Sequence, residues 1–402
     1  MNINSKHYTY YLFFISIFFY NLFLTYLNYL PSNFFIGDGL TYKELSEKLF
    51  YEFKYYENFP EEYPYRSWRT PGYPIFLFLL KFIGIESANE LFILNQIFLI
   101  LTYLFFLNIL FIFNPKDGLI NLLLILLLYI SHINLQFSYY IHNHNEPFYI
   151  FLITLGVYFI IKSIIEKKEL FIFLGLIILS FSCLVRTPTL PITTLVLVTL
   201  FCISFSKRNQ LSTVKIFVYF ITFYLFPLIW MIRNYFILDH FPFFLGSQST
   251  HLLLGTFRYI DWTYIDTFAY DRINEFKNNF EIIRPSLITQ EAISRILSDP
   301  IFYINTRIMN FLKYLINNYT FFSILVLAFY TFQKFFLKFN KVKLLIFLKS
   351  IENKVVLSSF LISIIFLIEM SMTFHVPRYG IIPSIFIMFF SNLLILKIIR
   401  IK

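Results

Sequence analysis

The chain has 402 residues, of which 58% are hydrophobic and 14% are charged, and its formal net charge is +10. Because ordinary soluble domains carry about 25% charged residues, this composition excludes a soluble globular protein and favours one that lies in lipid. The basic residues gather at the ends of apolar runs and form no continuous basic face, so we predict no nucleic acid partner.

Apolar runs of transmembrane length recur along the whole chain. The hydrocarbon core of a bilayer is about 30 Å thick, and about 20 residues of helix cross it. We therefore predict an all-α polytopic membrane protein of about ten transmembrane helices, with residues 1–402 forming one multi-pass domain. The predicted spans are 8–30, 90–113, 118–138, 147–165, 169–185, 189–206, 214–232, 318–337, 355–374 and 380–398.

The lysines and arginines orient these spans. With the N-terminus in the cytoplasm, the inner connections carry most of the basic residues, including the run from Lys334 to Lys354. The short outer connections then carry only Arg186 and Arg378 besides histidines. This asymmetry follows the positive-inside rule. We predict a multi-pass protein of the plasma or inner membrane with both termini in the cytoplasm.

Two apolar segments are not counted as spans. Residues 72–84 are too short to cross a bilayer and contain Lys81, and counting them would place the lysine clusters outside. We predict that they lie at the membrane interface. Residues 341–354, which are apolar with interspersed lysines, are predicted to form a cytoplasmic interfacial helix.

Two predicted outer segments are long. Residues 31–88 form the first, in which apolar residues at helical spacing predict a helix over 40–53. Residues 233–317 form the second, and a helical stretch over 287–318 is predicted to break near Pro300. Both segments are rich in aromatic residues, unlike disordered linkers.

Asp38 lies just beyond the predicted outer end of the first span, between Gly37 and Gly39. Small neighbours let a substrate approach the backbone closely, and a carboxylate there could act as a general base on an acceptor hydroxyl or as a metal ligand. The alternative is structural: Asp38, or the nearby Thr41, is well suited to cap the helix that begins near Leu40.

Four arginines lie on the predicted outer side: Arg69, Arg186, Arg233 and Arg378. A guanidinium binds phosphate oxygens in a bidentate manner, so an arginine cluster is a natural receiver for a phosphate. The alternative is that each arginine only extends its charge to the membrane interface. Because arginine is the unusual choice on the outer side, the sequence favours phosphate binding.

The segment His142-Asn143-His144-Asn145-Glu146 occupies a short outer turn. Two histidines and a carboxylate could ligate zinc, but Glu146 fits better as a second catalytic or acceptor-binding acid. We assign no metal ligands; Mg²⁺ or Mn²⁺ stays open as a cofactor, and no other cofactor is predicted. Further substrate-binding candidates are Tyr42, His144, Asn234, His251, His375 and Tyr379.

Motifs for nucleotide binding are missing from the sequence. It contains no nucleotide-binding glycine loop and no Walker lysine. Since membrane pumps need such a site to use ATP, we do not predict ATP-driven transport by this chain alone.

Seven short motifs occur in one order and on one predicted side of the membrane. They are Gly37–Tyr42, Arg69–Pro74, Glu146–Gly156, Leu184–Pro188, Pro227–Tyr235, Asp299–Arg307 and Arg378–Pro383. In this order and sidedness the chain resembles the polytopic GT-C glycosyltransferases, in particular the bacterial relatives of protein O-mannosyltransferases and the aminoarabinose lipid A transferase. It departs from the mannosyltransferases in one motif, because Asp38 is followed by Gly39 and not by a second acid.

The resemblance implies a sugar transferase that works on the outer side of the membrane. The donor would be a polyprenyl-phosphate sugar, and the acceptor a glycan, lipid or protein hydroxyl. Asp38 would act as the base, and Arg186, Arg233 and Arg378 would stabilise the leaving phosphate. Arg69 would either contact that phosphate or position the helices of the first outer segment. Two other classes stay open: a glycolipid flippase or transporter, and a surface polysaccharide polymerase or ligase.

Overall fold

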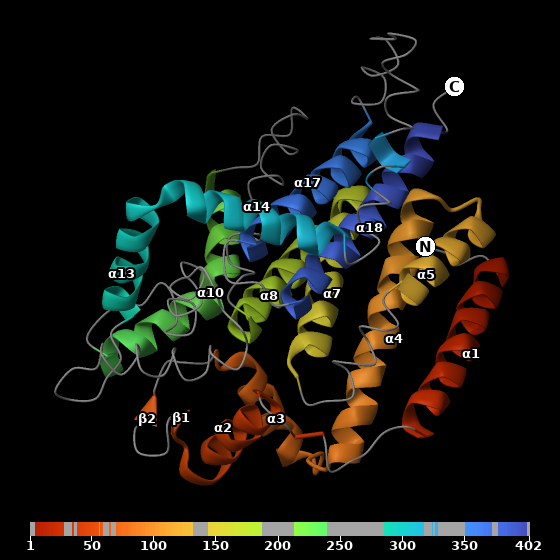
Figure 1. Cartoon of the computed structure of the whole chain (residues 1–402). Coiled ribbons are helices and arrows are strands. Elements are labelled where there is room, and N and C mark those ends of the chain that lie inside the picture. The colour runs from red at the N-terminus through yellow and green to blue at the C-terminus, as the bar shows by residue number, and fades with distance from the viewer. Residues whose placement is uncertain are drawn as a thin grey trace.

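The computed structural model describes residues 5–27, 34–35, 38–55, 57–58, 64–65, 70–131, 144–186, 213–238, 285–316, 324, 326–328, 350–371 and 377–399. Apart from one short strand pair, the regular elements in these ranges are helices (Figure 1). The all-α prediction is therefore confirmed. The helices are α1 (Ser5–Leu27), α2 (Asp38–Glu52), α3 (Gly72–Phe82), α4 (Ala88–Phe113), α5 (Gly118–Ser131), α7 (Glu146–Glu166), α8 (Glu169–Val185), α10 (Thr213–Leu238), α13 (Pro285–Ser298), α14 (Pro300–Ile316), α17 (Ile351–Ser371) and α18 (Pro377–Ile399).

Within the described ranges, three helices are long and apolar enough to cross a membrane: α4, α7, and residues 217–236 of α10. The 26 residues of α4 extend about 39 Å at 1.5 Å per residue, more than the roughly 30 Å of a hydrocarbon core. Shorter apolar helices accompany them in α1, α3, α5, α8 and α18. The composition and these helices indicate a membrane-associated protein. Of the ten predicted spans, 189–206 and most of 318–337 lie outside the described residues.

The first predicted outer segment contains two paired helices. The predicted helix over 40–53 is confirmed as α2, and α3 covers the apolar segment that was predicted not to span. With 11 residues, α3 extends about 16 Å, too short to cross a bilayer. Between them, β1 (Glu57–Asn58) pairs antiparallel with β2 (Pro64–Tyr65). In Figure 1, α2 and α3 lie below the lower ends of α7 and α8.

The break predicted near Pro300 is also confirmed, because α13 ends at Ser298 and α14 begins at Pro300. Proline has no backbone N–H and suits the first position of a helix. The carboxylate of Asp299 accepts a hydrogen bond from the backbone N–H of Phe302 at 3.1 Å, which caps α14.

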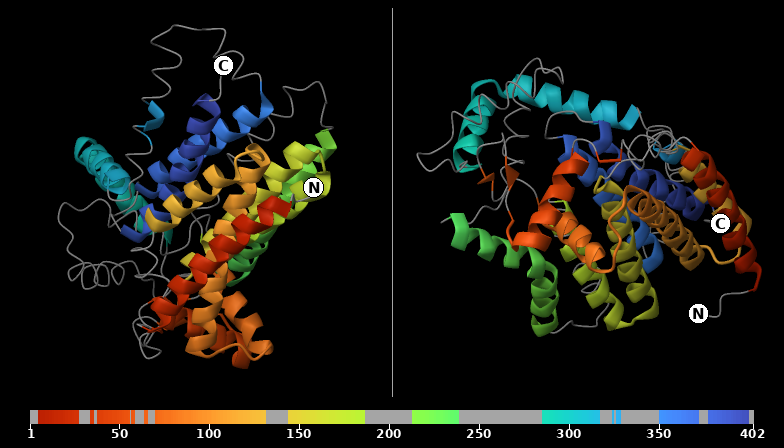
Figure 2. Two further views of the ribbon diagram at one scale, coloured as in Figure 1. Left: turned by 90° about the vertical axis from the view of Figure 1, so that its right-hand side faces the viewer. Right: turned by 90° about the horizontal axis from the view of Figure 1, so that it is seen from below.

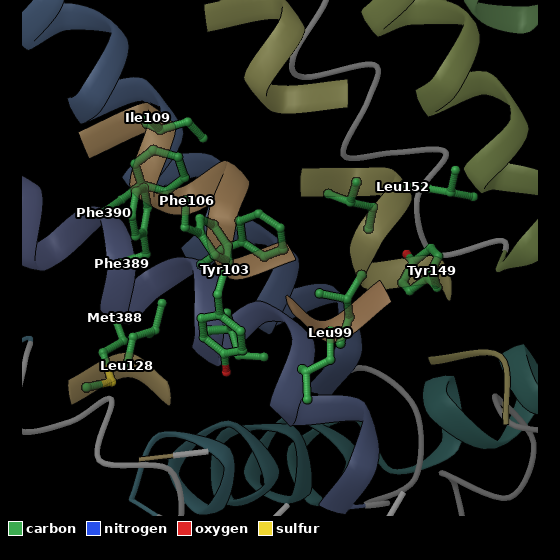
Figure 3. Packing of buried hydrophobic residues seen from close by; sticks show 14 of the residues in the cluster. Leu99, Tyr103, Phe106, Ile109, Leu128, Tyr149, Leu152, Met388, Phe389 and Phe390 are labelled. Carbon is green, nitrogen blue, oxygen red and sulfur yellow. The ribbon is translucent and has the colours of Figure 1, made fainter. Parts of the chain in front are cut away.

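The central packing joins helices that are distant in sequence. Phe106 of α4 lies 4.4 Å from Phe389 of α18, measured between ring centroids. Figure 3 shows these rings together with Tyr103, Leu128 and Met388. Next to this core, α7 packs closely on α8. A Cβ at Gly156 would lie 2.7 Å from Cγ of Leu179, so glycine is needed for the close approach of the two helices.

The helix α10 changes direction along its length (Figure 2, right). Pro227 lies inside it, and an internal proline removes a helix hydrogen bond and causes a kink. The segment after Pro227 therefore turns away from the bundle and reaches the end of α2. It carries Trp230, Arg233 and Asn234.

Candidate functional site

The beginning of α7 and the end of α8 lie at the same end of the bundle, because the two helices are consecutive and antiparallel. Pro147 is at the start of α7, where its fixed backbone angle favours a helix start. Helix α8 ends at Val185, and Arg186 has an extended backbone. The sequence has Pro188 two residues later, which favours a helix end before it. These local rules place Glu146 and Arg186 side by side.

Glu146 and Arg186 form a buried ion pair. The Nη1 of Arg186 donates a hydrogen bond to Oε1 of Glu146 at 3.0 Å, with side chains only 11% and 7% exposed for arginine and glutamate. The guanidinium carbon also lies 5.7 Å from the ring centroid of Tyr149. Removing one partner of a buried pair leaves an uncompensated charge, which typically costs about 3–5 kcal/mol. Glu146 and Arg186, which the sequence singled out separately, are therefore partners in one ion pair.

The amide of Asn145 joins this ion pair to the first outer segment. Its Nδ2 donates to the hydroxyl of Tyr42 at 2.9 Å and to the carbonyl of Val185 at 3.2 Å. The hydroxyl of Thr70 donates to the same carbonyl at 2.9 Å. All of these groups are buried. We call Tyr42, Thr70, Asn145, Glu146 and Arg186 the junction, because they tie α2 and the start of α3 to the ends of α7 and α8.

Backbone packing holds the junction as closely as its hydrogen bonds do. A Cβ on Gly72 would lie 2.5 Å from the carbonyl carbon of Leu184, so a larger residue would force α3 away from α8. Tyr73 is buried and meets the ring of Tyr42 edge-on, with centroids 5.2 Å apart. Burial, followed by the neighbouring Tyr42 and Glu146, raises the pKa of Tyr73. Its phenol therefore stays protonated at physiological pH.

The predicted base, Asp38, is the first residue of α2. It lies four residues before Tyr42, and such a spacing places two residues on one face of a helix. The first turn of α2 is therefore next to the junction, although the side chain of Asp38 lies outside the described atoms. The same position also suits the helix dipole, which favours an acidic residue in the first turn.

Arg233 belongs to a second cluster, at the other end of α2. Its Nη1 donates to Oδ1 of Asn234 at 2.8 Å, and its Nη2 donates to the backbone carbonyl of Tyr55 at 3.2 Å. The guanidinium carbon lies 4.5 Å from the ring centroid of Trp230. The rings of Tyr55 and Trp230 meet edge-on at 5.3 Å. We call Tyr55, Trp230, Arg233 and Asn234 the α10 cluster.

The two described arginine sites are thus separate. Tyr42 contacts the junction, whereas Tyr55 follows the end of α2 at Glu52. Ten residues of helix between Tyr42 and Glu52 correspond to about 15 Å. Arg186 is bonded to Glu146 at the junction, and Arg233 is bonded to Asn234 and Tyr55 in the α10 cluster.

The remaining predicted site residues are placed in part. His144 is buried beside Asn145. Arg378 and Tyr379 lie in the first turn of α18, but their side chains are outside the described atoms. Arg69, His142, His251 and His375 are outside the described ranges altogether. Among the described side chains, no three His, Cys, Asp or Glu residues lie close enough to hold a metal ion.

Sequence reasoning missed several residues of both groups: Thr70 and Asn145 at the junction, Tyr73 packed against it, and Tyr55 and Trp230 in the α10 cluster. Thr70, Tyr73 and Asn145 are neighbours of residues that were singled out, so motif position could have indicated them. Tyr55 takes part through its backbone carbonyl, which no side-chain pattern predicts.

Searches among protein families, curated proteins and solved structures found no match to this chain.

Proposed function

We propose that this chain is a multi-pass membrane glycosyltransferase that moves a sugar from a polyprenyl-phosphate donor to an acceptor hydroxyl on the extracytoplasmic side. The observation that supports it best is the junction, in which a buried Glu146–Arg186 pair lies next to Asn145, whose amide donates to Tyr42 in the helix that begins at Asp38. Charged groups are expensive in so apolar a chain and mark function by default.

In this proposal each charged residue has a separate role. Asp38 accepts the proton of the acceptor hydroxyl, whose oxygen forms a bond to the anomeric carbon. The bond from that carbon to the donor phosphate breaks on the opposite face, so the sugar inverts and polyprenyl phosphate leaves. Outer arginines stabilise the negative charge that develops on the phosphate. Glu146 orients Arg186, since its carboxylate already accepts a hydrogen bond from that guanidinium.

The choice of donor follows from sidedness. Nucleotide sugars are made in the cytoplasm, whereas the predicted topology puts the junction on the outer side. A lipid-phosphate sugar reaches that side with its hydrocarbon tail in the bilayer. The acceptor would be a hydroxyl of a glycan, lipid or protein that the two long outer segments bind.

The test is transfer of label from a panel of radiolabelled polyprenyl-phosphate sugars by membranes that contain the wild type or Asp38→Asn. The proposal expects transfer by the wild type and a loss of about 10²–10⁴-fold in the variant, with donor binding retained because the amide keeps the shape of the acid. Equal transfer by both proteins would remove Asp38 as the base. No transfer from any donor by folded wild type would favour a flippase, or a polymerase or ligase.

A further inference from the structure

The α10 cluster contains buried hydrogen-bond donors that have no acceptor. The Nδ2 of Asn234, a residue that is 0% exposed, and the buried Nε1 of Trp230 both have no hydrogen-bond partner. Buried polar groups are nearly always bonded, so each exception calls for an explanation such as a missing ligand. Trp230 and Asn234 are four residues apart on α10, and therefore lie on one face of the helix.

The orientation of the Asn234 amide is fixed by its neighbour. Its Oδ1 accepts a hydrogen bond from Arg233 at 2.8 Å, and a guanidinium can only donate. Turning the amide over would place its NH₂ group against that donor. The unsatisfied atom of Asn234 is therefore an N–H donor and not an acceptor.

The charge and the donors of the cluster select one kind of ligand. Arg233 brings a positive charge next to these donors and itself donates to the amide of Asn234 and the carbonyl of Tyr55. The guanidinium stacks over the Trp230 ring and Tyr55 meets that ring edge-on, so the arginine and the two rings form one packed group. N–H donors beside a positive charge suit an oxyanion.

From these contacts we infer that the α10 cluster is an oxyanion site that binds a phosphate group through Nδ2 of Asn234, Nε1 of Trp230 and the charge of Arg233. The position of the cluster indicates a lipid phosphate. Residues 217–236 are long and apolar enough to cross a membrane, and Trp230, Arg233 and Asn234 lie in the last two turns of that segment. This is the depth of the phosphate layer of a bilayer.

Two lipids could bring a phosphate there, the polyprenyl-phosphate carrier and a phospholipid. The carrier assignment rests on the proposed function, whereas the oxyanion site does not. We assign the site to the carrier, because the proposed transferase uses that lipid on the same side of the membrane. The α10 cluster would then hold polyprenyl phosphate apart from the point of sugar transfer, because Asp38 lies at the other end of α2.

The experiment measures binding of polyprenyl phosphate without a sugar to the full chain in phosphatidylcholine nanodiscs. Trp230→Phe removes one N–H and keeps the ring, so affinity should fall about fivefold. Asn234→Asp replaces the amide donor by a carboxylate beside Arg233 and should weaken binding more than about tenfold. The control is Thr222→Val on the same helix, whose exposed hydroxyl donates to the carbonyl of Val218 at 2.7 Å.

A second measurement guards against misfolding. Saturating polyprenyl phosphate should raise the Tm of the wild type and of Thr222→Val, and should leave the Tm of Asn234→Asp almost unchanged. Equal affinity in the wild type, Trp230→Phe and Asn234→Asp, or an equal rise of Tm in all of them, would overturn the site.

Competition identifies the carrier. Phosphatidylglycerol or inorganic phosphate could displace polyprenyl phosphate from the site, and Trp230→Phe could weaken the affinity of that competitor to the same degree. Such a result would support the oxyanion site and overturn its assignment to polyprenyl phosphate. The two proposals also fail separately. Binding that depends on Asn234, without sugar transfer from any donor, would refute the glycosyltransferase and keep the site. Sugar transfer with unaltered binding in both variants would do the reverse.

Discussion

The junction and the α10 cluster contact opposite ends of α2, and they use polar groups in opposite ways. At the junction, Arg186 donates to Glu146, and one amide of Asn145 donates twice. In the α10 cluster, N–H groups of Trp230 and Asn234 are buried without acceptors. A satisfied network makes one arrangement rigid, whereas an unsatisfied one binds a ligand that supplies what is missing. The junction therefore positions α2, and the α10 cluster binds.

The largest stability effect is expected from breaking the buried ion pair. Arg186→Gln should lower the free energy of unfolding by about 3–5 kcal/mol, because Glu146 would stay buried without its partner. Chemical denaturation of the purified protein in detergent measures this. The matched control is Lys215→Gln, which breaks the Lys215–Glu169 pair, whose side chains are 46% and 56% exposed. Exposed pairs contribute about 0–1 kcal/mol.

A double substitution completes that test. Glu146→Gln combined with Arg186→Gln should be more stable than Arg186→Gln alone, because no isolated charge remains at the junction. If the two single changes simply add, the two side chains do not interact in the folded protein.

Asn145 offers a test that separates stability from activity. Asn145→Leu should cost about 1–3 kcal/mol, since it leaves the carbonyl of Val185 and the hydroxyl of Tyr42 with fewer bonds. Asn121→Leu should cost a similar amount, because Asn121 exchanges buried hydrogen bonds with Asn114 between α4 and α5. Sugar transfer per folded molecule should fall only in the first variant. A similar fall in both would mean that Asn145 has a structural role alone.

Tyr42→Phe should have a smaller effect. It removes the hydroxyl that accepts from Asn145 and should cost about 1 kcal/mol. Because Tyr42 anchors the turn that follows Asp38, kcat should fall while the KM for the donor stays the same. Tyr8→Phe, at an exposed position of α1, is the control and should change neither. An altered KM with an unchanged kcat would instead put Tyr42 in contact with substrate.

The smallest expected effect on stability is the one that best distinguishes the α10 cluster from the junction. Without ligand, Trp230→Phe should change stability by less than about 0.5 kcal/mol, because the N–H that it removes has no partner. Thermal unfolding in the absence of phosphate measures this against Tyr42→Phe. A loss at Trp230 as large as that at Tyr42 would show that the indole N–H is bonded in the free protein.

Local features of the fold were predictable from the sequence. Helical spacing of apolar residues located α2, and Pro300 located the break between α13 and α14, because both depend on a few consecutive residues. The length of residues 72–84 was enough to predict that a helix there would be too short to cross a bilayer. Helices are also found where eight of the ten spans were predicted, and the other two predictions fall mostly or wholly outside the described residues.

The pairing of side chains was not predictable. Glu146 and Arg186 were each singled out, but as an acid and a phosphate ligand, not as partners. Their contact depends on the approach of α7 to α8, which Gly156 permits, and forty positions separate them in the sequence. Arg233 was grouped with Arg186 as one receiver of phosphate. Its contacts with Trp230 and Tyr55 depend on the direction of α10 after Pro227, which the hydrophobic pattern does not contain.

The most direct test of the account compares Glu146→Gln with Glu169→Gln in the sugar-transfer assay, normalised to folded protein. The two glutamates are each paired with a basic residue, one at the junction and one at the opposite end of the α7–α8 pair. Transfer should fall at least about tenfold in Glu146→Gln and stay at the wild-type rate in Glu169→Gln. Equal transfer by the two variants would contradict the claim that the junction organises the active site.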